Sequence, residues 1–174
     1  ARSDARGCAR TVLGAGDVGS LKIGRAAYVS AMSLGALSPE AKVALARGAR
    51  RAGTLSCSGE GGRLPAEREE AALYVLEMAS GYFGWNEGAI EAADAIEIKL
   101  GQSAKPGLGG QLPAAKLTDE IAAMRGLAAG DASISAARFP GIDSTEARDA
   151  RSGWVREHLP EMPVGVQLAG SDRA

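Results

Sequence analysis

Two glycine-rich segments hold the residues of this sequence whose types and spacing are best suited to chemistry on a ligand. The first, Ser56–Gly62 (SCSGEGG), places the carboxylate of Glu60 between glycines on both sides. Glycines let the backbone approach a ligand closely, so we expect Glu60 to project into a site. The alternative is a flexible surface turn, although loops that follow strands often carry function.

The second segment, Gly101–Pro113 (GQSAKPGLGGQLP), combines four glycines with two prolines, two glutamines and a lysine. Permissive and rigid residues alternate along it, which favours a loop of one defined shape. Lys105 is then a fixed cation for a carboxylate or phosphate, and Gln111 offers a neutral donor and acceptor. The alternative for Lys105 is a surface lysine in a long turn.

A third segment, Met32–Gly35 (MSLG), follows an expected strand and predicts another wall of the same site. Its backbone groups and the Ser33 hydroxyl are suited to a planar cofactor. Ligands bind at the carboxyl ends of strands in parallel α/β folds. The three segments therefore define one candidate site, with a small anion as its ligand.

Strand-like and helical patterns alternate along the chain. Strands are expected at Tyr28–Ser33, Gly53–Ser58, Ala95–Leu100, Ser133–Ala136 and Val164–Leu168, and helices at Pro39–Arg51, Pro65–Ser80, Thr118–Met124 and Ser144–His158. Ser38 is placed to cap the first helix, with proline in its first turn. This alternation predicts βαβ units and a parallel sheet.

A doubly wound sheet and a (β/α)8 barrel both produce such a pattern. Leu13–Gly19 (LGAGDVG) offers the glycine spacing of a dinucleotide site, but no convincing strand precedes it. The barrel is preferred. A whole barrel takes about 250 residues, so we expect an incomplete (β/α)8 TIM-type barrel of about five βα units. One domain is predicted over 1–174, with 1–20 as an irregular lead-in.

Composition excludes several classes of function. Apolar residues make up 45% of the 174 residues, and the formal charge is −1, which points away from nucleic acid and membrane surfaces. No apolar run approaches a membrane span or a signal sequence, so a cytoplasmic location is expected. The two cysteines, Cys8 and Cys57, are too few for a disulfide framework or an iron–sulfur cluster.

Four segments together carry a resemblance to a known family. They are Met32–Lys42, the Ser-Gly-Glu-Gly-Gly loop, Ser80–Gly84 and Glu97–Pro113. In order and spacing, roughly over 20–170, they resemble the FMN-binding domain of glutamate synthase. The variant Ala-Gly-Thr-x-x-Cys-Ser-Gly-Glu-Gly-Gly followed by Pro-Ala-Glu-Arg is also similar to archaeal-type glutamate synthases and to methylglutamate synthase subunits.

The resemblance implies a (β/α)8 barrel that carries FMN beside a [3Fe–4S] cluster. The implied reaction forms 2-iminoglutarate from 2-oxoglutarate and ammonia, and reduced FMN delivers hydride to give glutamate. The implied partners are an electron-donor subunit or ferredoxin and a glutaminase domain or subunit.

Carried over by position, the resemblance assigns roles to seven residues. Glu60 and Lys105 are the implied catalytic residues. The implied substrate-binding residues are Glu60, Lys105 and Gln111, and those bordering the flavin are Met32, Ser33, Gln102 and Gln167. Glutamine at 167 replaces a lysine usual in the family and can hydrogen-bond to the flavin ring without stabilising its negative charge.

Other departures keep alternatives open. Tyr82 stands where the family commonly has arginine, and Ser135–Phe139 lacks the family's usual histidine pair. The later phosphate-binding glycine loops and the three cluster cysteines have no counterpart in this chain. A non-catalytic half-barrel that binds a carboxylate ligand or a partner therefore remains an alternative, as does a methylglutamate synthase subunit.

Overall fold

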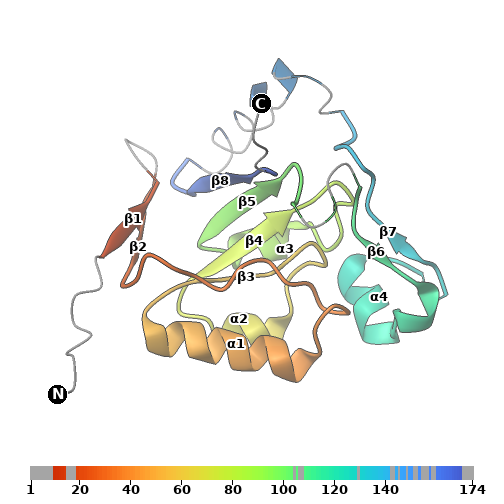
Figure 1. Cartoon of the computed structure of the whole chain (residues 1–174), viewed down its shortest axis with the longest axis horizontal. Coiled ribbons are helices and arrows are strands. Elements are labelled where there is room, and N and C mark those ends of the chain that lie inside the picture. Colours follow the sequence, from red (N-terminus) through yellow and green to blue (C-terminus); the bar gives the residue numbers. More distant parts are fainter. Residues whose placement is uncertain are drawn as a thin grey trace.

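A four-stranded parallel sheet with helices on one face forms the centre of the molecule (Figure 1). The computed structural model describes residues 10–14, 19–103, 105, 108–128, 130–141, 144, 146–147, 149–150, 153, 157 and 160–169. The strand order is β3 (Ser56–Cys57), β4 (Tyr74–Met78), β5 (Ala95–Lys99) and β8 (Val164–Gln167). This confirms the predicted α/β class and the parallel sheet.

Three helices cover the outer face of the sheet: α1 (Pro39–Ala52), α2 (Pro65–Glu70) and α3 (Glu87–Glu91). Helix α1 packs through Ala46 against Tyr74 of β4, and α3 packs through Ala89 against Leu76 of the same strand. Alternate residues of each strand therefore point toward helices, and the residues between them point to the inner face.

Helix α1 begins at Pro39, as predicted, and ends at Ala52, one residue beyond the predicted Arg51. The Ser38 hydroxyl accepts a hydrogen bond from the backbone N–H of Ala41 at 3.3 Å, and Pro39 occupies the first turn. Gly53 ends the helix in the left-handed conformation, at φ 69°. These contacts satisfy backbone groups that the helix ends leave unpaired.

The prediction of one helix over Pro65–Ser80 is wrong. Helix α2 ends at Glu70, and Tyr74–Met78 forms strand β4. All five residues of β4 are buried, because the strand lies between β3 and β5 and is covered on both faces. Such a strand lacks the alternation of apolar and polar residues that reveals a half-exposed strand.

Two other expected strands differ from the prediction. Tyr28–Ser33 forms only one parallel bridge, from Val29 to Ser56, and is otherwise irregular. Strand β7 (Ser133–Ile134) lies within Ser133–Ala136 but pairs antiparallel with β6 (Gln111–Leu112), outside the parallel sheet. The glycine-rich loop after β5 supplies the partner strand, which the sequence pattern did not indicate.

Opposite ends of the sheet are closed by different elements. At the amino ends of the strands, β1 (Thr11–Leu13) and β2 (Leu21–Ile23) form an antiparallel pair that packs against the inner-face core. At the carboxyl ends lie β6, β7, the short 3₁₀ helix η1 (Ala114–Lys116) and α4 (Asp119–Arg125) (Figure 1). Helix α4 confirms the helix expected over Thr118–Met124.

Two sequence expectations fall largely outside the described residues. Gly16 of the dinucleotide-like segment is among the residues not described, as is much of Ser144–His158, including Trp154 and His158. Within the described part of the chain, no helix is long and apolar enough to cross a membrane.

Candidate functional site

A cavity of about 300 Å³ lies at the carboxyl ends of the strands, where the sequence predicts the site. Its walls come from the segment before α1, the loop after β3, the end of β5 and the glycine-rich loop that follows β5. Six of the seven predicted site residues line it: Met32, Ser33, Glu60, Gln102, Lys105 and Gln111.

The Met32–Ser33 wall is anchored by Lys42, a lysine of α1 whose exposed fraction is only 1%. Its ammonium group donates to the carbonyl oxygens of Met32 at 2.7 Å and Ser58 at 2.9 Å, and pairs with Glu67 at 2.9 Å. The ammonium has three N–H donors, so these contacts satisfy all of them. Lys42 thereby fixes two walls of the cavity relative to each other.

Gly59 brings the same two walls into direct backbone contact. Its φ is +74°, and a Cβ atom there would lie 2.5 Å from the Ser33 nitrogen and 2.6 Å from the Met32 carbonyl carbon. Only glycine fits both this conformation and this approach. The glycines beside Glu60 were predicted to let the backbone approach a ligand, whereas at Gly59 the close approach is to the Met32–Ser33 backbone.

Glu60 takes part in a chain of charged groups that runs into the sheet. Its carboxylate lies 3.5 Å from the ammonium of Lys99, which in turn lies 3.4 Å from the carboxylate of Glu77. A Cβ atom at position 110 would overlap the Glu60 carboxylate, so Gly110 leaves the space that this side chain occupies. Lys99 thus links the cavity to the inner face of the sheet.

Among the carboxyl groups in the part of the chain that the structure describes, Glu77 has the most strongly shifted pKa. Burial raises its pKa to about 7, and the negative charges of Glu97 and Glu60 act in the same direction. Lys99 opposes the shift but only in part. A buried carboxyl group beside a shared cation is therefore poised to exchange a proton near neutral pH.

Arg125, at the end of α4, supplies a buried cation on the other side of the cavity. Its guanidinium donates to the Ser133 hydroxyl at 2.7 Å and to the Leu34 carbonyl at 3.0 Å, and lies 5.4 Å from the centre of the Phe83 ring. These contacts hold the arginine in one orientation. Burial lowers its pKa, and the nearby Glu60 opposes that shift.

The cavity carries an excess of positive charge. Among its described lining residues, one carboxylate, Glu60, is set against four cations: Lys99, Lys105, Lys116 and Arg125. Since Lys99 already pairs with Glu60, the remaining cations favour an anionic ligand with more than one negative group. The lining thus suits a small dianion such as a dicarboxylate.

The seventh predicted site residue, Gln167, does not line this cavity. It lies on β8, in register with Lys99 of β5, and its side-chain oxygen is buried with no hydrogen-bond partner in the described part of the chain. Residues in register on parallel strands point to the same face. Gln167 therefore lies on the inner face beside Lys99.

Four charged residues of the site were not predicted: Lys99, Lys116, Glu77 and Arg125. The signal for Lys99 was available, because Glu97 and Lys99 alternate with isoleucines in Ala95–Lys99 and must share one face of the strand. Glu77 was missed because its strand, β4, was predicted to be part of a helix. Arg125 joins the site only because α4 packs against β6 in the folded chain.

Comparison with known proteins gives independent information. Residues 11–173 match the family model described as "Conserved region in glutamate synthase". The chain is 40% identical over 151 residues to an archaeal-type glutamate synthase [NADPH] of Thermotoga maritima, and 42% identical over 156 residues to the archaeal glutamate synthase [NADPH] of Methanocaldococcus jannaschii. A glutamate synthase large subunit-like protein of Rhizobium meliloti is 38% identical over 144 residues.

These alignments cover most of this chain but a minor part of each relative. They take in 86%, 89% and 82% of the chain, and 30%, 31% and 33% of the Thermotoga, Methanocaldococcus and Rhizobium proteins respectively. The chain thus corresponds to about one third of the length of these relatives.

Proposed function

This chain belongs to the glutamate synthase family, and we propose that it forms the substrate-binding wall of an enzyme that reductively aminates 2-oxoglutarate to glutamate. The observation that supports this proposal most strongly is the excess of cations around the cavity at the strand ends. 2-Oxoglutarate is a dianion whose two carboxylates need separate positive or hydrogen-bonding partners. The proposal includes the expectation that the parallel sheet is part of a (β/α)8 barrel.

In this proposal, Lys105, Gln111 and Arg125 bind the two carboxylates of 2-oxoglutarate. Lys105 and Gln111 line the cavity and are exposed, whereas Arg125 is buried and oriented by Ser133 and Leu34. A fixed arginine suits one carboxylate because its donors match carboxylate geometry. The ammonium of Lys105 can then pair with the other carboxylate.

Glu60 and Lys99 take part in proton transfer in the proposed reaction. Condensation of ammonia with the ketone forms 2-iminoglutarate and releases water, and it requires proton transfer to the departing oxygen. Glu60 lines the cavity, and its carboxylate shares the Lys99 ammonium with Glu77. A proton held by Glu77 removes one negative charge from these three groups and can thereby stabilise them during the transfer. Addition of hydride and a proton to the imine then yields glutamate.

The residues present fit the ring end of FMN, which supplies the hydride when it is bound and reduced. The rigid Met32–Ser33 backbone, the Ser33 hydroxyl and Gln102 all line the cavity. The buried, unpartnered oxygen of Gln167 lies beside Lys99 on the same face and is suited to a polar edge of a flavin ring.

A [3Fe–4S] cluster does not fit the described residues. Cys57 is buried between carboxylates, and burial raises the pKa of its thiol well above the usual value. Cluster ligation requires several thiolates, and Cys8 lies outside the described part of the chain. In this proposal an electron-donor subunit or ferredoxin supplies the electrons, and a glutaminase domain or subunit supplies the ammonia.

The proposal is tested with the 174-residue chain, FMN and a chemical reductant. We expect quenching of FMN fluorescence on mixing, and formation of glutamate from 2-oxoglutarate and ammonia above the rate of the protein-free mixture. Methylamine in place of ammonia tests the methylglutamate alternative through the mass of the product. Binding of 2-oxoglutarate without either product supports the non-catalytic half-barrel, and absence of both flavin and 2-oxoglutarate binding contradicts the proposal.

A further inference from the structure

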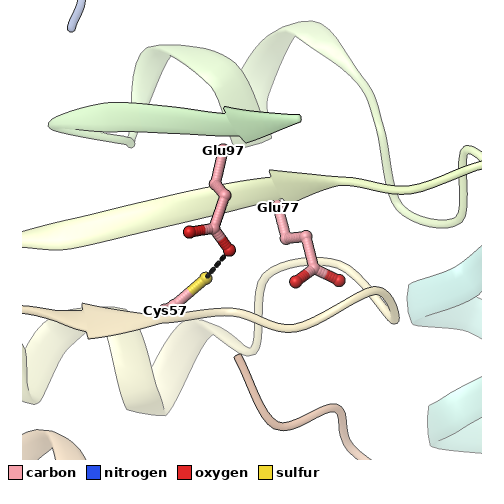
Figure 2. Close-up of side chains that lie close together, drawn as sticks. All are labelled: Cys57, Glu77 and Glu97. Atoms are coloured by element: carbon pink, nitrogen blue, oxygen red, sulfur yellow. Dashed lines mark hydrogen bonds between the residues drawn. The ribbon is translucent and has the colours of Figure 1, made fainter. Parts of the chain in front are cut away.

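Three side chains on neighbouring strands converge on the inner face of the sheet. Figure 2 shows Cys57 of β3, Glu77 of β4 and Glu97 of β5 with their polar ends turned toward one another. The Cys57 sulfur lies 3.9 Å from a carboxylate oxygen of Glu97, and one potential ligand atom of each residue lies within 4.8 Å of the other two. This cluster lies deeper in the sheet than the cavity, which none of the three residues lines.

The carboxylates of Glu77 and Glu97 lie side by side, where two negative charges repel each other. Glu77 and Glu97 are register partners on adjacent parallel strands, so their side chains point to the same face. Like charges directly opposite destabilise a sheet. The cations nearby are Lys99, which contacts one oxygen of Glu77, and Lys42, whose charge also acts on Cys57.

A free coordination position exists on Glu77. Only 2% of this residue is exposed, and its second carboxylate oxygen has no hydrogen-bond partner among the residues that the structure describes. Its first oxygen is held by Lys99 at 3.4 Å, and Figure 2 shows the carboxylate beside the Cys57 sulfur. A buried acceptor without a donor costs free energy unless something else occupies it.

We propose that Cys57, Glu77 and Glu97 bind one divalent transition-metal ion of the zinc type. A thiolate with two carboxylates suits zinc or cobalt, whereas magnesium and calcium prefer oxygen ligands alone. Zinc lies about 2.0–2.3 Å from such ligands, so small rotations of the three side chains close the site. Binding releases the thiol proton, together with any proton held by Glu77, to solvent. The ion supplies two positive charges against the three ligand charges, and Lys99, shared between Glu77 and Glu60, contributes to the remainder.

The site has a route of access and room for a further ligand. A second cavity of about 300 Å³ opens on the inner face and is lined by Glu97, Tyr28, Val75 and strand residues of β8. Tyr28 is 47% exposed, and its hydroxyl lies within hydrogen-bonding range of the Glu97 carboxylate. Three protein ligands leave one tetrahedral position for water or a substrate group.

Cobalt(II) tests the proposal directly, because a cobalt–thiolate bond gives a charge-transfer absorption in the near ultraviolet. We expect the metal-free 174-residue chain to bind one Co²⁺ with this absorption, and equimolar Zn²⁺ to displace it. Cys57→Ser removes the absorption, whereas Cys8→Ser, a change at the other cysteine, leaves it intact. Glu97→Gln weakens Co²⁺ binding at least tenfold, the lower end of the effect seen when metal-site partners are removed.

Circular dichroism first establishes which variants fold. If Cys57→Ser does not fold, Glu97→Gln decides the question, since glutamine keeps a hydrogen-bond acceptor for Cys57. The exposed Glu91→Gln is its control and is expected to bind Co²⁺ like the unchanged chain. A chain that gives no thiolate absorption at tenfold excess of Co²⁺, or one whose absorption survives Cys57→Ser, overturns the proposal.

Discussion

Replacing Lys42 by methionine is expected to lower the free energy of unfolding by about 3–5 kcal/mol, the cost of breaking a buried ion pair from one side. The change leaves the buried Glu67 carboxylate without its cation, although Tyr74 still donates to it at 2.7 Å. It also leaves the Met32 and Ser58 carbonyls without their donor. Urea unfolding followed by circular dichroism measures the loss.

Arg47→Met is the matched control on the same helix. Arg47 pairs with Glu70 at 2.8 Å, but its side chain is 56% exposed. Exposed ion pairs contribute about 0–1 kcal/mol, so this variant should unfold almost like the unchanged chain. Equal losses for the two variants would show that Lys42 does not hold the two walls of the cavity together.

Gly59→Ala is expected to destabilise the chain by about 2 kcal/mol or more, because the left-handed conformation alone costs a non-glycine residue about 1–2 kcal/mol. The added Cβ atom also overlaps the Met32–Ser33 backbone, which cannot move without releasing the contacts of Lys42. Thermal unfolding measures the loss of stability, and titration with 2-oxoglutarate measures the loss of affinity that a displaced cavity wall would cause.

The control for this change is Gly48→Ala in the exposed middle of α1. A Cβ atom at Gly48 meets nothing within 4 Å, and alanine is favoured over glycine in a helix by about 0.5–1 kcal/mol. The two glycine replacements should therefore change stability in opposite directions. A Gly59→Ala chain as stable as the unchanged one would contradict the close backbone approach.

Helices whose ends carry capping residues were predicted from the sequence. Ser38 and Pro39 predicted the start of α1, whereas Gly53, predicted to begin a strand, ends this helix. The helix expected from Thr118 is α4, and the Thr118 hydroxyl accepts a hydrogen bond from the backbone N–H of Ile121. The predicted wall, loop and strand-end residues meet at one cavity because parallel strands bring their carboxyl ends together. Glycine spacing located Glu60 and Lys105 without any knowledge of the fold.

The elements that the sequence did not predict are those whose structure depends on contacts between distant segments. Strand β4 is buried on both faces, and its Glu77 interrupts an apolar pattern for a reason that only the neighbouring strands supply. The pairing of β6 with β7 and the position of Arg125 beneath it arise when α4 packs against Leu34 and Leu112. No local pattern specifies these long-range contacts.

The cationic cavity is expected to bind a dicarboxylate. Isothermal titration of the 174-residue chain with 2-oxoglutarate and with 2-oxobutyrate, which lacks the second carboxylate, tests it most directly. We expect 2-oxoglutarate to bind at least tenfold more tightly, because a lost charge-assisted hydrogen bond costs about 1.5–3 kcal/mol. Lys105→Met should remove most of this preference, while Lys22→Met, an exposed lysine of β2, should leave it unchanged. Equal affinity for the two acids, or a preference that survives Lys105→Met, would contradict the account.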